Sequence, residues 1–311
     1  MNQENNSRVA EFVLLGLSSS WELQYFFFML FNFLYIIIVL GNLLIVLTVI
    51  SEPALHTPMY IMLSNLSILD VFLATYATPK MIHDFLHEPK TISFEGCMAQ
   101  IFLLHVFAGG EMVLLVAMAY DRYVAICIRG QMSPLHYATI INVCKCISLV
   151  VGSWLTRALH SVSQLVFTVH LPFCGPNRVH SFFCYLPLVI KLACTDTFTL
   201  EVLMLSDSSL MAISFVLLLV SYMVILVTVR RRSSAGMAKA RATLTAHIAV
   251  VTLFFGLCIF IYAWPISSLP VDKFLSIFYI VFTHLLNPLI YTRNKEVISA
   301  MQKLRHRQVR S

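Results

Sequence analysis

The chain contains seven long stretches of mainly apolar residues, and polar segments separate them. The stretches cover roughly residues 25–50, 58–84, 97–127, 139–165, 200–229, 242–264 and 274–292. A helix needs about 20 mainly apolar residues to cross a bilayer, so each stretch is long enough. Of the 311 residues, 59% are hydrophobic and only 12% are charged, which leaves too much apolar surface for a soluble fold. The sequence therefore predicts an all-α membrane protein, a seven-transmembrane helix bundle.

The basic residues predict the orientation of this bundle. With the N-terminus outside, 14 of the 21 Lys and Arg residues lie on the cytoplasmic side, where membrane proteins carry an excess of these residues. The net charge of +6 then indicates topology and attraction to membrane lipid, and not nucleic-acid binding. We expect an extracellular N-terminal tail over 1–24, the seven-helix domain over 25–292, and a cytoplasmic amphipathic helix and tail over 293–311.

Four cysteines fall on the predicted outer side, and one glycosylation sequon lies in the tail. In an oxidising compartment Cys97, Cys174, Cys184 and Cys194 predict two disulfides, although the sequence leaves three pairings open. The sequon predicts glycosylation at Asn5. No Cys or His spacing indicates zinc, and no catalytic constellation is visible at the membrane interface, so we expect neither an enzyme nor a cofactor.

Two acids are expected near the middle of the membrane. Asp70 lies about 18 Å along the second stretch, and Glu111 lies at a similar depth in the third. Buried carboxylates in one bundle could bind a cation such as Na+, share protons, or do both. Alternatively, one or both are simply protonated and hydrogen-bonded to Asn42 or Asn287.

Three further features stand out along the apolar stretches. Pro288 should kink the seventh helix, and Asn287 could satisfy the backbone carbonyl that the proline frees. Arg157 lies within the fourth stretch, where it either faces the bundle or is a damaging substitution. Asp121 and Arg122 end the third stretch, where they serve at least as an interfacial anchor.

Short motifs follow one another in a fixed order over nearly the whole chain. They are Leu55–Tyr60, Met118–Cys127, Pro134–Tyr137, Ser221–Tyr222, Lys239–Ala240 with Thr243 and His247, and Leu286–Tyr291. Through these motifs the chain resembles the mammalian odorant receptors, which are rhodopsin-like class A G-protein-coupled receptors. The segments Glu11–Leu17 and Lys90–Gln100 are most similar to the family-four K-type subfamily.

The resemblance implies a receptor in the plasma membrane of olfactory cilia. It would bind small volatile organic ligands and activate the olfactory stimulatory G protein, which raises cyclic AMP. The family's disulfides would pair Cys97 with Cys184 and Cys174 with Cys194. The family's ligand pocket, carried over by position, would be lined by Leu104, His105, Ala108, Gly109, Met112, Ser206, Leu210, Phe255, Cys258, Ile259, Tyr262 and Ile280. Coupling to the G protein and switching would involve Asp121, Arg122, Tyr123, Tyr222, His247, Asn287, Pro288 and Tyr291, around a polar core of Asn42, Asp70 and Glu111.

The sequence departs from the family pattern in several places. Residues 128–132 are inserted in a loop that contacts the G protein in the family, His284 stands where the family has Pro, and Tyr185 replaces an Asp. Together with Arg157, these departures leave open a receptor that folds poorly or does not couple. A transporter or channel is the less favoured alternative, because only Asp70 and Glu111 lie near a possible polar path.

Overall fold

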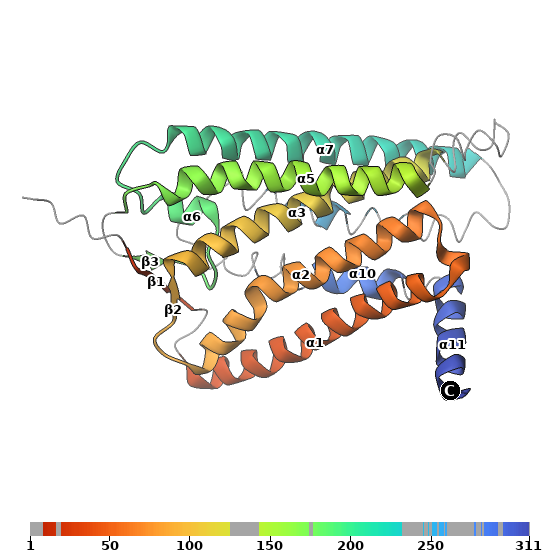
Figure 1. Cartoon of the computed structure of the whole chain (residues 1–311), viewed down its shortest axis with the longest axis horizontal. Coiled ribbons are helices and arrows are strands. Elements are labelled where there is room, and N and C mark those ends of the chain that lie inside the picture. Colours follow the sequence, from red (N-terminus) through yellow and green to blue (C-terminus); the bar gives the residue numbers. More distant parts are fainter. Residues whose placement is uncertain are drawn as a thin grey trace, which may run out of the picture.

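Long helices running side by side dominate the structure, a computed structural model (Figure 1). It describes residues 9–16, 20–124, 143–173, 177–231, 245, 248, 251–253, 255–257, 259, 277, 281, 283–291 and 295–310. The long helices are α1 (Trp21–Ser51), α2 (Pro58–Leu86), α3 (Phe94–Tyr123), α5 (Val143–Val169) and α7 (Phe198–Arg231). Helix α3 packs against α2, α5 and α7, so it lies at the centre of the bundle.

The described helices agree with most of the predicted membrane spans. Helices α1, α2 and α3 and the part of α7 from Phe198 to Val229 are long and apolar enough to cross a membrane. Helix α5 overlaps the predicted stretch 139–165. The predicted stretches 242–264 and 274–292 lie mostly outside the described residues, and α10 (Thr283–Tyr291) covers the end of the last one.

The two faces of α1 explain why this bundle requires a membrane. Phe31, Ile38 and Ile45 recur every seventh residue and are at most 4% exposed, so they form the face that packs on the bundle. Phe33 and Leu40 follow the same spacing on another face and are 63% and 62% exposed. An apolar stripe of this kind is unfavourable in water, whereas lipid tails can cover it at no such cost.

A small sheet closes one end of the bundle, which we call the disulfide end. Strand β1 (Glu11–Leu14) lies between β2 (Thr91–Ser93), to which it is antiparallel, and β3 (Arg178–Val179), to which it is parallel. The side chains of Phe12 and Leu14 are 0% and 2% exposed. The short helix α6 (Leu186–Ile190) is buried beside this sheet. The segment expected to be an N-terminal tail therefore supplies the central strand of the sheet.

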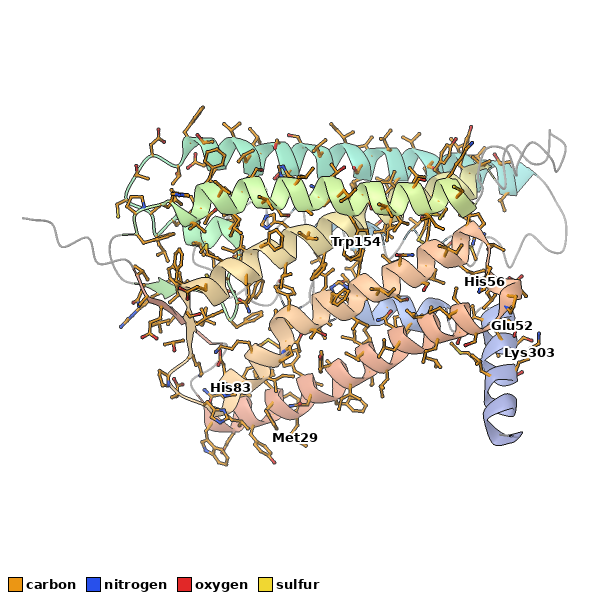
Figure 2. All side chains as sticks on the ribbon, in the orientation of Figure 1. Met29, Glu52, His56, His83, Trp154 and Lys303 are labelled. Carbon is orange, nitrogen blue, oxygen red and sulfur yellow. A yellow bond between two sulfur atoms is a disulfide. The ribbon has the colours of Figure 1, made fainter. Side chains whose placement is uncertain are left out.

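The opposite end carries the amphipathic helix α11 (Lys295–Arg310), which runs across the direction of the long helices (Figure 1). Between α1 and α2 the chain forms the 3-10 helix η1 (Pro53–Leu55). The Tyr60 hydroxyl of α2 donates a hydrogen bond of 2.5 Å to Glu296 Oε2, and Lys303 donates one of 3.2 Å to Glu52 (Figure 2). We call this end the α11 end.

Candidate functional site

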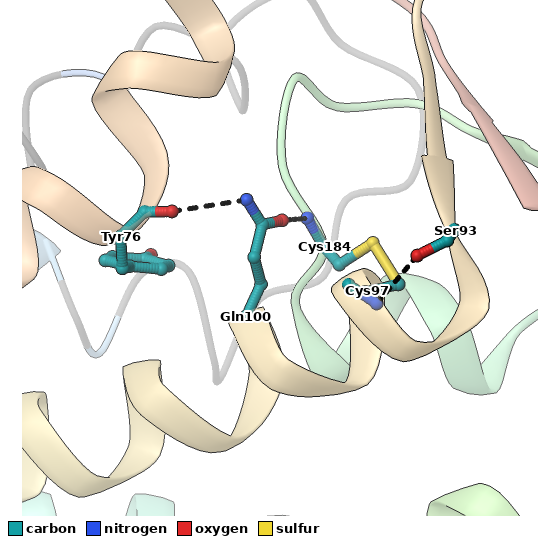
Figure 3. Close-up of a disulfide and its surroundings, with 6 residues drawn as sticks. Tyr76, Ser93, Cys97, Gln100 and Cys184 are labelled. Atoms are coloured by element: carbon teal, nitrogen blue, oxygen red, sulfur yellow. Dashed lines mark hydrogen bonds between the residues drawn. A yellow bond between two sulfur atoms is a disulfide. The ribbon is translucent and has the colours of Figure 1, made fainter.

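A disulfide and a glutamine fix the loop after α5 to the start of α3 (Figure 3). Cys97 and Cys184 are disulfide-bonded, so the pairing implied by the family resemblance is confirmed. The Gln100 side chain accepts a hydrogen bond of 2.9 Å from the Cys184 backbone N–H and donates one of 3.4 Å to the Tyr76 carbonyl. Cys194 is also disulfide-bonded. Its predicted partner Cys174 lies outside the described residues, as does the predicted glycosylation site Asn5.

Four side chains from two helices form a polar group that we call the α5–α7 cluster: Arg157, His160 and Gln164 from α5, and Asp207 from α7. Arg157 Nη1 donates a hydrogen bond of 3.1 Å to Asp207 Oδ1, and His160 Nε2 lies 3.0 Å from the same oxygen. Gln164 Nε2 donates a hydrogen bond of 2.7 Å to Asp207 Oδ2. Of the two interpretations of Arg157, the structure supports the one in which it faces the bundle and is paired.

Arg157 also reaches the middle of α3. A Cβ atom added to Gly109 would overlap Nε, Cδ and Cζ of Arg157, so the arginine occupies the space that a side chain at Gly109 would fill. Its Nη2 atom lies 3.9 Å from Met112 Sδ. His105, four residues before Gly109, interacts electrostatically with Asp207, His160 and Arg157. The α5–α7 cluster therefore lies against the part of α3 that the family resemblance assigned to the ligand pocket.

The other predicted ligand-binding residues divide into three groups. Leu104 and Phe255 are buried, and the Phe255 ring stacks on Phe215 at 5.5 Å between centroids, while Ala108 and Ile259 are partly buried. Ser206 and Leu210 are exposed on α7, and Leu210 is 52% exposed. The carry-over by position misplaced these two residues, because α7 presents the neighbouring Asp207 to the bundle instead. The remaining predicted residues, Cys258, Tyr262 and Ile280, lie outside the described residues.

A second polar group, the core cluster, joins α2, α3 and α10 in the interior. His284 Nδ1 lies 3.0 Å from Asp70 Oδ1, and both side chains are fully buried. Asn287 donates a hydrogen bond of 2.8 Å to Asp70 Oδ2, in line with the alternative that Asp70 is simply hydrogen-bonded. Glu111 is 2% exposed and lies close enough that its carboxylate and the ligating atoms of Asp70 and His284 are all within 4.8 Å of one another.

The residues of the core cluster fit a small cation. Carboxylate oxygens are the preferred ligands of hard cations, and a buried negative charge is stabilised by a positive one. Glu111 Oε2 is buried and, among the described residues, has no hydrogen-bond partner. His284 Nδ1 already contacts one oxygen of Asp70, so in this chain the imidazole fills one of the positions around Asp70 that a cation could occupy.

The kink at Pro288 is supported from α1. Proline has no N–H, so the carbonyl four residues earlier, that of His284, loses its helical hydrogen bond. Asn42 donates a hydrogen bond of 3.2 Å to this carbonyl, so the expectation that Asn287 would do so is wrong. A Cβ atom added to Gly41 would lie 3.0 Å from Pro288 Cβ, so a larger residue would force α1 and α10 apart. Gly41 therefore lets α1 pack closely against Pro288, and Asn42 bonds to the carbonyl that the proline frees.

Charged and aromatic side chains meet at the α11 end of α3. Asp121 is 2% exposed, and Arg122 and Tyr123 are partly buried. Tyr222 of α7 is 3% exposed and interacts electrostatically with Arg122. The structure thus brings together two of the predicted switch residues from distant parts of the chain. His247 and the side chain of Tyr291 lie outside the described residues.

Sequence reasoning missed three members of the α5–α7 cluster: His160, Gln164 and Asp207. One signal could have found Asp207. A base and an acid that lie well inside two different apolar stretches are expected to pair, because an unpaired charge inside a membrane is unfavourable. Arg157 and Asp207 are such a pair.

Comparisons with known proteins give a consistent result. The sequence profile of a family described as "Olfactory receptor" matches residues 31–307. The chain is 64% identical to human olfactory receptor 4K15 over 99% of this chain and 94% of the relative. It is 59% identical to human olfactory receptor 4K3 over 98% and 96% of the two chains, and 59% identical to human olfactory receptor 4K1 over 100% and 99%.

Proposed function

Because the chain belongs to the olfactory receptor family, we propose that it binds small volatile organic molecules in its bundle and activates a stimulatory G protein. It is a signalling receptor and not an enzyme, and its family has the seven-helix fold that the sequence predicted. Two observations support the mechanism: a polar group lies at the predicted ligand pocket, and Arg122 interacts electrostatically with Tyr222 at the opposite end of α3 and α7.

The receptor would sit in the plasma membrane with the disulfide end outside. Disulfides form in oxidising compartments, and the bundle carries Cys97–Cys184 at that end. Helix α11, at the other end, is rich in Lys and Arg, as expected of a segment on the cytoplasmic leaflet. Membrane lipid would contact the apolar faces of α1 and α7.

The odorant would bind between α3, α5 and α7, together with the helix predicted over 242–264. Leu104, His105, Gly109 and Met112 supply the α3 side of this pocket, and Phe255 supplies an apolar surface opposite. Ligand pockets in proteins are mostly apolar with a few polar groups that orient the ligand, and these residues have that composition. Cys258, Tyr262 and Ile280 are proposed for the same pocket on the family resemblance alone.

Activation would be a shift between two arrangements of the helices. A ligand that binds one arrangement more tightly increases its population, and small rearrangements of packed helices can open a cavity at the other end of a bundle. At the α11 end, Arg122 and Tyr222 would rearrange to receive the G protein, with Asp121 and Tyr123 beside them. The core cluster lies between the two ends. A sodium ion held by Asp70 and Glu111 would add a positive charge there.

The observation that carries the proposed mechanism is the electrostatic interaction of Arg122 with Tyr222, a buried tyrosine on another helix. The test replaces Arg122 with Ala and measures cyclic AMP in cells expressing the receptor, with antibody labelling of an N-terminal tag to quantify surface receptor. We expect Arg122→Ala to abolish the odorant response while the amount at the surface stays similar.

A matched control replaces a basic residue at the same end of the molecule. Lys303 is 57% exposed and pairs with Glu52, so we expect Lys303→Ala to leave the cyclic AMP response intact. An undiminished response in Arg122→Ala at equal surface expression would contradict the mechanism.

A further inference from the structure

The charges of Arg157 and Asp207 cancel. Arg157 is the base, Asp207 is the acid, and their side chains are only 13% and 12% exposed. An additional charge brought to this site would have no partner, and an unpaired charge in a low-dielectric interior is strongly unfavourable. The site therefore disfavours ligands that carry a carboxylate or an ammonium group.

The hydrogen-bonding capacity of the cluster is unevenly used. Both oxygens of Asp207 accept a hydrogen bond, one from Arg157 and the other from Gln164, and His160 Nε2 lies 3.0 Å from the first. Arg157 donates to Asp207 and contacts the sulfur of Met112. A guanidinium group has five N–H donors, so these two contacts leave donors available. The cluster can thus donate to an additional acceptor.

One acceptor in the cluster is also unused. Gln164 is 1% exposed, and its Oε1 atom has no hydrogen-bond partner among the described residues. A buried polar atom without a partner is unfavourable, so a ligand hydroxyl that donated to it would gain affinity. The cluster can therefore form hydrogen bonds with a ligand oxygen that accepts from the Arg157 guanidinium. The hydroxyl group of an alcohol can in addition donate to Gln164 Oε1.

The position of Arg157 directs this capacity toward α3. Its guanidinium stem lies against Gly109, where the lack of a side chain leaves room, and its Nη2 atom lies near Met112. Both of these α3 residues belong to the proposed odorant pocket. A ligand lying on this part of α3 would therefore meet the donors of Arg157.

We propose that Arg157, with Gln164, makes this receptor selective for uncharged odorants that carry a hydrogen-bonding oxygen, such as alcohols and aldehydes. The inference rests on the proposed function, because it assigns the ligand class of the same pocket. Asp207 keeps the site neutral and holds Arg157 in place. Acids and amines are rejected because they bring a charge, and alkanes because they leave the polar groups without partners.

The test measures cyclic AMP against pools of straight-chain alcohols, aldehydes, carboxylic acids, amines and alkanes, each pool running from butyl to dodecyl. We expect the wild-type receptor to respond to the alcohol and aldehyde pools at concentrations at least about tenfold lower than to the others. Two variants follow, Asp207→Asn and the double variant Arg157→Leu with Asp207→Leu, each at matched surface expression.

The two variants should change the ligand preference in different ways. Asp207→Asn leaves the charge of Arg157 uncompensated, so the acid pool should gain about tenfold over the alcohol pool. The double variant removes both charges, so it should no longer distinguish alcohols from alkanes. Ser209→Ala is the control, because this exposed side chain on α7 bonds only to its own helix and should change nothing.

The outcomes separate this inference from the proposed function. A wild-type response that favours acids, amines or alkanes overturns the inference and leaves the receptor function standing, as does a double variant that keeps the alcohol preference. If only one of the two variants reaches the surface, that variant decides, and an unchanged preference in it refutes the role of the charge pair. If no pool raises cyclic AMP above the level of Arg122→Ala, the proposed function itself fails.

Discussion

Asn42 should contribute to stability mainly because Pro288 leaves the His284 carbonyl without a helical donor. Asn42 Nδ2 donates to that carbonyl at 3.2 Å, and Asn42 is fully buried. In Asn42→Ala the carbonyl loses this donor in a site that water does not reach. In Pro288→Ala, by contrast, the new N–H at position 288 can bond to the same carbonyl within α10.

The expected magnitude follows from the loss of one buried hydrogen bond. An unsatisfied buried acceptor costs about 1–3 kcal/mol in soluble proteins, whereas interhelical bonds in membranes average about 0.6 and reach about 1.7 kcal/mol. We therefore expect Asn42→Ala to destabilise the wild-type receptor by about 1–1.5 kcal/mol. In the Pro288→Ala background the same change should cost less than about 0.5 kcal/mol, because the carbonyl is then bonded within its helix.

The assay is thermal unfolding of the purified receptor in detergent for the four members of this double-mutant cycle. Asn65→Ala is the matched control, because the Asn65 side chain bonds at 2.9 Å to the Ile61 carbonyl within its own helix and leaves no carbonyl orphaned. If Asn42→Ala costs as much with alanine at position 288 as with proline, the link between Asn42 and the kink is refuted.

Three further changes test other parts of the structure. Phe12→Ala should destabilise the receptor by about 3–5 kcal/mol and reduce surface labelling sharply, because the Phe12 side chain is fully buried, whereas a dispensable tail would show no effect. Asp207→Leu should reduce the free energy of unfolding by about 3–5 kcal/mol, because it leaves Arg157 unpaired. Replacing both residues with Leu should be nearly neutral, and an equal loss of stability in the single and the double variant would disprove the pairing. Tyr60→Phe removes the hydrogen bond to Glu296, so amide hydrogen exchange in α11 should rise while exchange in α3 stays the same. Unchanged exchange in α11 would show that this hydrogen bond does not hold α11 in place.

The membrane class and the long helices could be predicted from the sequence, because both depend on local composition. A stretch of about 20 apolar residues has few alternatives to a helix in lipid, since every backbone polar group must be bonded within the segment. The Cys97–Cys184 pairing was available only through the family resemblance, because the sequence by itself leaves the pairings open.

Predictions failed where a side chain had more than one possible partner, or where the rotation of a helix about its axis decided which residues face the bundle. Asn287 was expected to bond to the freed carbonyl, but it bonds to Asp70, and Asn42 comes from α1 to take its place. Ser206 and Leu210 were assigned to the pocket by position, but the rotation of α7 places them on the exposed surface. Sequence spacing does not fix how a helix is rotated about its axis when all of its faces are apolar.

The amino-acid pattern was enough to predict a membrane-spanning helical bundle and to recognise its family. The pairing of the buried charges became visible only in the packed helices. Arg157 pairs with Asp207, and Asp70 meets His284, across 50 and 214 residues of sequence. The physical reason is that the membrane makes an unpaired buried charge or polar group unfavourable without specifying its partner. The partner is set by the packing of the helices, which depends on contacts such as Gly41 with Pro288 and Gly109 with Arg157.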